Sequence, residues 1–145
     1  MKATLKDSVI FEEEGSTHDL VELARENGGK ISIGRSRENI IVIGGVTFAG
    51  STYINVVSRR HGTITVDPEK GTVYFTDDSK YRTAIERIGG DMMLVRKGET
   101  VRLQDRDDLY FGVEDVPSEY RYGPLYVRIE IEEVRNGGEF PAVVE

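Results

Sequence analysis

A β-hairpin is predicted by the stretch GTITVDPEKGTVYFT, residues 62–76. Ile64 and Val66 alternate with polar residues, which is the period of a strand that buries one face. Asp-Pro-Glu-Lys-Gly at 67–71 follows as a turn, because proline presets φ and glycine accepts a positive φ. Residues 72–76 then return to strand composition and complete the hairpin.

Segments on both sides of this hairpin repeat the pattern of short strands and turn residues. The clearest is 125–131, in which apolar and polar residues alternate strictly, as in a half-buried strand. Further strands are predicted at 8–12, 30–33, 39–43, 53–57, 83–88, 92–95, 100–103 and 109–111. Short strands at near-regular spacing, without long helical periods, predict an all-β sandwich or barrel.

Residues 18–23 allow two interpretations. Their apolar side chains would share one face of a short helix capped by Ser16 or Thr17. They could equally form a strand that leads into a turn at Asn-Gly, residues 27–28, which is a strong hairpin signal. We favour the strand, because alternating apolar residues continue at 30–33.

The chain length of 145 residues fits one domain, which we place at 1–135, followed by a flexible tail at 136–145. With 0 Cys, the sequence excludes disulfides and thiolate metal sites and fits a reducing compartment. No apolar run approaches the roughly 20 residues that span a bilayer. Residues 1–11 lack the apolar stretch of a signal peptide. We therefore expect a cytoplasmic protein without a membrane partner.

The charge balance argues against a nucleic-acid partner, for which a basic footprint is expected. There are 19 basic and 26 acidic residues, a net charge of −7. The interval 35–82 nevertheless holds seven basic and five acidic residues, so it is locally positive. This basic island predicts an anion site if folding brings its loops together. The alternative is that these are ordinary solvated side chains.

Motifs for catalysis or for metal and cofactor binding are weak. Two histidines, His18 and His61, exclude multi-histidine metal sites. Ser58 lies close to His61 in the sequence, but such spacing does not define a catalytic triad. The acidic stretch 105–108 lacks the glycine and closing glutamate of a calcium loop, and no phosphate-binding glycine loop is present. We expect no enzyme activity, no metal and no cofactor.

Four motifs follow one another in order: Gly34-Arg35, Ser58-Arg59-Arg60-His61, Ser79-Lys80-Tyr81-Arg82-Thr83, and the stretch 103–112. They resemble the pattern of the forkhead-associated (FHA) domain family, which runs Gly-Arg, Ser-Arg-x-His, Ser-x-Asn-Gly-Thr and an ending of the Leu-x-x-Gly-Asp-x-Ile-x-Phe-Gly kind. The resemblance covers about residues 30–112. It implies a β-sandwich of about eleven short strands that binds phosphothreonine peptides through loops at one end, as a signalling or adaptor module without catalysis.

The resemblance also implies a role for each matching residue. Arg35 would bind the phosphate, Ser58 would donate its hydroxyl to a phosphate oxygen, and Arg59 would add a second contact. Gly34 and His61 would support the site from within. A phosphate carries about −1.5 to −2 charges and three acceptor oxygens, so guanidinium and hydroxyl groups suit it chemically. The basic island lies on these same loops.

Two departures from the family pattern lie in the third motif. Tyr81 stands where the family has the asparagine that clamps the peptide backbone, and Arg82 stands where it has glycine. A phenol offers one hydroxyl, whereas an amide offers paired donors and an acceptor. Lys80 and Arg82 could instead add charge to the phosphate site. Arg106 likewise replaces the glycine before Asp107, which we interpret as a turn variation.

The predicted phosphopeptide site therefore comprises Arg35, Ser58, Arg59, Lys80, Tyr81 and Arg82. Two other functions stay open at this point. The missing asparagine allows a phosphate-independent docking or oligomerisation module with the same fold. The adjacent carboxylates at 77–78 allow a small sandwich enzyme that acts on acidic or sugar substrates.

Overall fold

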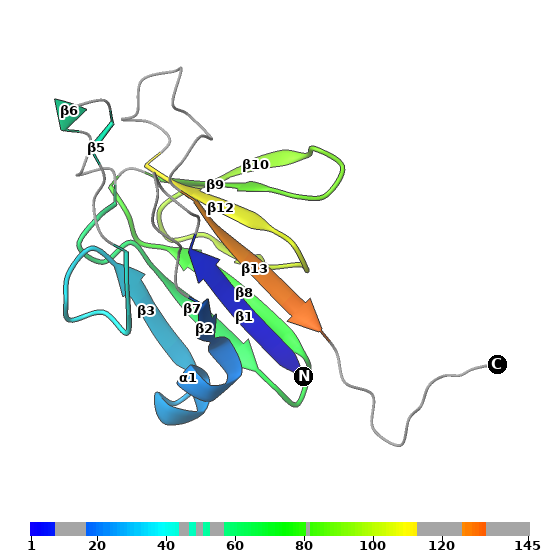
Figure 1. Ribbon diagram of the computed structural model, residues 1–145. Coiled ribbons are helices and arrows are strands. Elements are labelled where there is room, and N and C mark those ends of the chain that lie inside the picture. The colour runs from blue at the N-terminus through cyan, green and yellow to red at the C-terminus, as the bar shows by residue number, and fades with distance from the viewer. Residues whose placement is uncertain are drawn as a thin grey trace.

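The computed structural model describes residues 1–7, 17–43, 47–48, 51–52, 57–80, 82–112 and 126–132. Two sheets make up most of this part (Figure 1). The six-stranded sheet has the order β10 (Met92–Val95), β9 (Thr83–Glu86), β12 (Asp108–Phe111), β13 (Tyr126–Glu132), β1 (Lys2–Asp7), β2 (Thr17–Asp19). The five-stranded sheet has the order β11 (Thr100–Arg102), β8 (Thr72–Asp77), β7 (Gly62–Asp67), β3 (Lys30–Gly34), β4 (Ile41–Val42). Strands β5 (Thr47–Phe48) and β6 (Ser51–Thr52) form a separate pair, and α1 (Leu20–Glu26) is the helix of the described residues.

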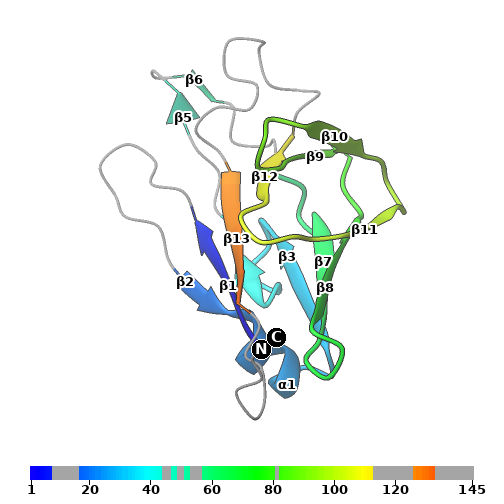
Figure 2. The ribbon, with the colours of Figure 1, turned by 90° about the vertical axis from the view of Figure 1, so that its right-hand side faces the viewer.

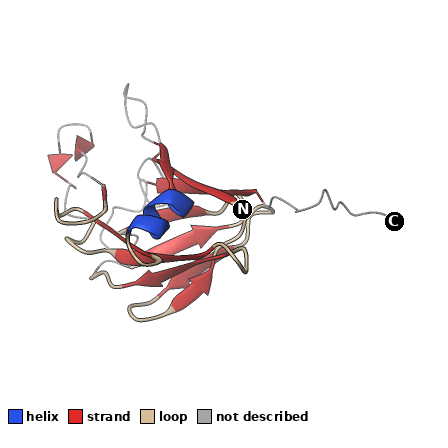
Figure 3. Ribbon diagram, turned by 90° about the horizontal axis from the view of Figure 1, so that it is seen from below, coloured by secondary structure: helices blue, strands red, loops and turns tan. Residues whose placement is uncertain are grey.

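The two large sheets face each other, as the perpendicular views of Figures 2 and 3 show. Buried apolar side chains from both sheets form the core. Leu5 of β1 and Ile129 of β13 pair directly and are fully buried on the inner face of one sheet. Ile64 of β7 and Phe75 of β8 do the same on the other sheet. The eleven strands of these two sheets confirm the predicted β-sandwich.

The hairpin predicted at 62–76 is formed by β7 and β8. Ile64 opposes Phe75 and Val66 opposes Val73, so the predicted apolar alternation faces the core. The predicted alternation at 125–131 is equally present in β13, where Val127 and Ile129 are buried.

The strand that we favoured at 18–23 is wrong beyond Asp19, because β2 ends there and helix α1 begins at Leu20. Asp19, not Ser16 or Thr17, caps this helix and accepts a hydrogen bond from the Glu22 N–H (3.1 Å). Leu20 and Ala24, four positions apart, share the buried face of the helix. Packing of that face against β1, β3 and β7 selects the helix over the strand.

The Asn-Gly pair at 27–28 ends this helix and does not form a hairpin turn. Asn27 N–H and Gly29 N–H both donate to the carbonyl of Ala24 (3.1 and 2.7 Å). Gly28 and Gly29 have φ values of 69° and 91°, the left-handed region in which helices commonly stop. A strong turn signal therefore acts here as a helix terminus.

Strand β1 was not predicted, although Ala3 and Leu5 alternate with polar residues in it. The strand predicted at 8–12, most of 53–57 and the tail predicted at 136–145 lie outside the described residues. Helix α1 has seven residues, so within the described part of the chain no helix is long enough to cross a membrane.

Replacement of the cap tests the helix. Asp19→Ala removes the acceptor for the Glu22 N–H, and we expect the free energy of unfolding to fall by about 1 kcal/mol in urea denaturation. Asp19→Asn is the matched control, since asparagine caps helices about as well as aspartate. An equal loss in both variants would contradict a capping role.

Candidate anion-binding site

Three loops leave the five-stranded sheet at the same edge. Ile33 near the end of β3 pairs with Gly62 at the start of β7, and Gly62 pairs with Asp77 at the end of β8. The segments 35–40, 57–61 and 78–80 therefore adjoin the same end of the sheet, at the end of β3 that lies away from α1 (Figure 1).

The first two of these loops are joined through their backbones. Arg35 N–H donates to the carbonyl of Ser58 and Ser36 N–H donates to that of Arg59, both at 3.0 Å. Gly34 makes this approach possible, since a Cβ there would overlap the carbonyl oxygen of Arg59 and lie 2.8 Å from the His61 nitrogen. The supporting role predicted for Gly34 thus has a steric basis.

A pocket of about 280 Å³ lies over these loops. The described residues that line it are Arg35, Ser58, Arg59, Arg60, Asp78, Lys80 and Lys97. Four of the six predicted site residues are therefore brought together. Within the described part of the chain, none of the five cations forms an ion pair with a carboxylate.

Arg35 and Ser58 each make a hydrogen bond in the pocket wall and keep further donors unused. Arg35 is half-buried, and its Nε donates to the carbonyl of Val57 (3.1 Å). This bond leaves the four terminal N–H groups of the guanidinium available. Ser58 Oγ accepts from the Lys80 N–H (2.9 Å), so its own O–H can donate to a ligand oxygen.

His61 is buried beneath the pocket and joins two of its loops. Its Nδ1 accepts from the Ser58 N–H (3.1 Å), so Nε2 carries the proton and donates to Thr83 Oγ1 (2.9 Å). Thr83 in turn donates to Asp77 Oδ1 (2.9 Å), which also accepts from Ser79 (2.8 Å). These bonds hold the neutral imidazole in one tautomer.

Burial shifts both titratable groups of this network toward their neutral forms. Desolvation lowers the pKa of His61 from 6.5 to about 3. Desolvation also raises the pKa of the Asp77 carboxyl, against the opposing effect of the hydrogen bonds from Ser79 and Thr83. The 3.8 Å approach of His61 Nε2 to Asp77 Oδ1 is therefore a contact of a neutral imidazole.

The His61 imidazole does not hydrogen-bond the Ser58 hydroxyl. The imidazole bonds the backbone N–H of Ser58, while the Ser58 hydroxyl bonds Lys80 on another loop. No base therefore touches this hydroxyl among the described residues. Asp77 is fully buried and only Asp78 reaches the pocket, so the two carboxylates do not face one substrate as a glycosidase pair would.

Of the two other predicted site residues, Arg82 is half-buried and does not line the pocket, whereas Tyr81 lies outside the described residues. Arg82 has φ 66° and Arg106 has φ 68°, the positive values among described non-glycine residues. Both positions are those at which the family pattern has glycine, which supports the residue-by-residue match.

The sequence does not place Arg60 and Lys97 at the predicted site, although both line the pocket. Arg60 belongs to the basic island, and Lys97 lies outside that interval. The turn that carries Lys97 reaches the pocket because Gly98 N–H donates to the Asp77 carbonyl (2.7 Å). No local sequence signal indicates this contact.

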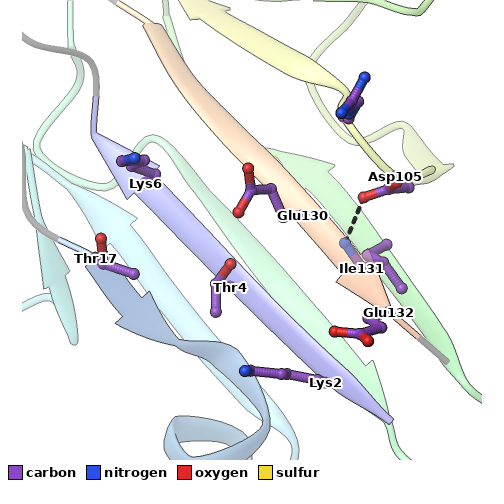
Figure 4. A pocket seen from close by; sticks show the side chains of 9 residues that line it. Lys2, Thr4, Lys6, Thr17, Asp105, Glu130, Ile131 and Glu132 are labelled. Carbon is purple, nitrogen blue, oxygen red and sulfur yellow. Dashed lines mark hydrogen bonds between the residues drawn. The ribbon is translucent and has the colours of Figure 1, made fainter. Parts of the chain in front are cut away.

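A larger hollow of about 540 Å³ lies on the outer face of the six-stranded sheet (Figure 4). Three cations line it, Lys2, Lys6 and Arg106, together with three carboxylates, Asp105, Glu130 and Glu132. Opposite charges face one another across the strands, with Lys2 in register with Glu132. This hollow is electrically balanced and is therefore not an anion site.

Five cations over the loops at one end of the β-sandwich form a candidate anion-binding site. A family comparison identifies the kind of domain. The FHA domain profile matches residues 31–112, and the chain belongs to the FHA domain family.

Solved structures of FHA domains have the same fold as this chain. The FhaA FHA domain complexed with the intracellular domain of Rv3910 is 19% identical, with 88% of this chain and 99% of that one covered and a TM-score of 0.56. The N-terminal FHA domain of S. cerevisiae Rad53p, in complex with a phosphothreonine peptide, is 16% identical (91% and 94% covered, TM-score 0.58). The MEK1 FHA domain with a phosphothreonine peptide of HOP1 is 16% identical (89% and 95% covered, TM-score 0.55). A search of the curated proteins finds no match.

The buried state of His61 predicts how stability depends on pH. Below pH 6.5 the unfolded chain protonates His61 while the folded chain does not, so stability is lost as the pH falls toward 3. Between pH 6.5 and about 5, this loss amounts to about 2 kcal/mol at about 1.4 kcal/mol per unit.

Asp77 changes the pH dependence of stability in the opposite direction. Because its pKa is raised in the folded protein, protonation of Asp77 stabilises the folded state as the pH falls. A comparison of the parent protein with His61→Gln separates the two effects, since Asp77 is retained in both. Urea denaturation at several pH values should show a shallower loss of stability with falling pH in His61→Gln. Parallel profiles would show that His61 does not stay neutral in the folded protein.

Proposed function

We propose that this FHA domain binds phosphothreonine-containing proteins or peptides and acts as a signalling or adaptor module. Arg35, Ser58, Arg59 and Lys80 would hold the phosphate, and Tyr81 and Arg82 would flank the peptide beside it. The observation that carries this proposal is the pocket, in which the four phosphate-binding candidates from three loops converge.

The chemistry of these side chains supports a phosphate ligand. The Arg35 terminal nitrogens and the Ser58 hydroxyl both have N–H or O–H donors to spare, and a phosphate offers three strong acceptor oxygens. The solved complexes of Rad53p and MEK1 FHA domains show that this fold can present a phosphothreonine site. The likeness in sequence to those domains is low, so the assignment here depends on this chain's own pocket.

We further propose that the module is not an enzyme and acts in the cytoplasm. The separation of the Ser58 hydroxyl from the His61 imidazole, and the burial of Asp77, support a binding role. The 0 Cys of the sequence fits a reducing compartment.

Arg35→Ala tests the phosphate contact. A charge-assisted contact to phosphate is worth about 1.5–3 kcal/mol, so we expect the affinity for a phosphothreonine peptide pool to fall roughly 10- to 100-fold. Isothermal titration calorimetry at two salt concentrations measures this, and the affinity of the parent should fall as salt rises.

Lys30→Ala is the matched control, since it removes one positive charge at the other end of the same strand. It should leave the affinity nearly unchanged. Equal affinity of the parent for phosphorylated and unphosphorylated pools would overturn the proposed function in favour of phosphate-independent docking.

Tyr81→Asn tests the position that departs most from the family. An asparagine amide can make two hydrogen bonds to a neighbouring peptide backbone, worth about 0.5–1.5 kcal/mol each, so binding of phosphothreonine peptides should strengthen. Tyr81→Ala is the comparison, because it removes the ring without adding an amide. Weaker binding in both variants would instead indicate that the Tyr81 ring contacts the ligand.

A further inference from the structure

The charge of the pocket exceeds what one phosphate can neutralise. Among the described residues, five cations and a single carboxylate, Asp78, line it, so this part of the lining carries four net positive charges. A phosphate group brings only about −1.5 to −2 charges. Even with a phosphate bound, about two positive charges would remain in a chain whose overall charge is −7.

The surplus comes from Arg60 and Lys97, the two lining cations that the proposed phosphate contacts leave unused. Both are exposed, and Arg60 lies on the loop that also supplies Ser58 and Arg59. Lys97 comes from the turn between β10 and β11, so it approaches the pocket from a separate element.

The backbone holds the turn that carries Lys97 in place. Asp77 N–H donates to the Glu99 carbonyl (3.1 Å), and Gly98 N–H donates to the Asp77 carbonyl (2.7 Å). Gly98 has φ 89°, a conformation that suits glycine and shapes the turn. Lys97 therefore stands at the pocket because of main-chain bonds and not because its ammonium has a partner.

The nearest acid of that turn does not neutralise Lys97. The Glu99 carboxylate accepts the N–H of Arg96 (2.8 Å) and so closes its own turn. Among the described residues, neither Lys97 nor Arg60 makes an ion pair. Two cations held at a binding pocket without a protein carboxylate are suited to an anionic group of the ligand.

We propose that Arg60 and Lys97 form a second anion subsite, and that the preferred ligand carries another negative group within a few residues of its phosphothreonine. This inference rests on the proposed function, because it assigns a ligand class to the same pocket. The second group is either a further phosphorylated residue or an aspartate or glutamate, since both present anionic oxygens to these cations.

Four degenerate peptide pools with neutral flanking residues test this inference. The first has a central threonine and the second a central phosphothreonine. The third and fourth keep the phosphothreonine and add, within three residues of it, one glutamate or one phosphoserine respectively. Affinities are measured by competition in fluorescence anisotropy for the parent, for Arg60→Ala/Lys97→Ala and for the control Lys30→Ala/Lys70→Ala. The control removes two exposed positive charges from the opposite end of the five-stranded sheet.

The parent should bind the glutamate pool severalfold, and the phosphoserine pool at least tenfold, more tightly than the pool with phosphothreonine alone. Arg60→Ala/Lys97→Ala should lose this preference while it keeps its affinity for phosphothreonine alone within about threefold. The control should keep the preference. Unchanged thermal unfolding of both double variants verifies that they fold, as expected for exposed side chains.

Two failures can be told apart. If phosphothreonine alone binds better than threonine but the second anion adds nothing, or the preference persists in Arg60→Ala/Lys97→Ala, the second subsite is overturned and the proposed function stands. If the phosphothreonine pools bind no better than the threonine pool, the proposed function fails and this inference fails with it.

Discussion

The approach of two backbones at Gly34 is the constraint on which the pocket depends. The space that a side chain would fill is occupied by the Arg59 carbonyl and the His61 nitrogen. Because position 34 has no Cβ, the loop that begins at Arg35 can lie against residues 58–61. It donates two backbone hydrogen bonds to the carbonyls of that segment. Arg35 and Ser58 therefore share a wall of the pocket although many residues separate them in the sequence.

A buried network of hydrogen bonds beneath this contact connects residues 58–61 to Asp77 and Thr83, which flank the third segment of the pocket. His61 accepts from the Ser58 backbone and donates to Thr83, and Thr83 donates to Asp77. Only the neutral imidazole can both accept and donate, so the burial that keeps His61 uncharged also makes its bonding pattern possible. The protonation state of one buried side chain and the arrangement of three surface loops are thus physically linked.

The pocket concentrates positive charge in a protein that is acidic as a whole. Exposed charges are screened beyond about 8–10 Å at physiological salt, so an anionic ligand would respond chiefly to the local field of the pocket. The balanced hollow on the six-stranded sheet shows the opposite arrangement, in which cross-strand pairs such as Lys2 and Glu132 offset each other. The location of the cations, and not their number in the chain, defines the candidate anion site.

The sequence by itself determined that the fold is built from short strands and turns, because strand alternation and turn residues are local properties. The choice of a sandwich over a barrel came from the resemblance to the FHA domain family. The donors that Arg35 and Ser58 could offer a ligand are likewise properties of the residues themselves. The sequence could not decide between helix and strand before β3, since the short apolar segment fits both periods until Leu20 and its neighbours pack against the sheets. Nor could it assign Lys97 to the pocket or give Arg82 its left-handed backbone. Those features arise from contacts between segments distant in the chain, and only the folded structure brings such segments together.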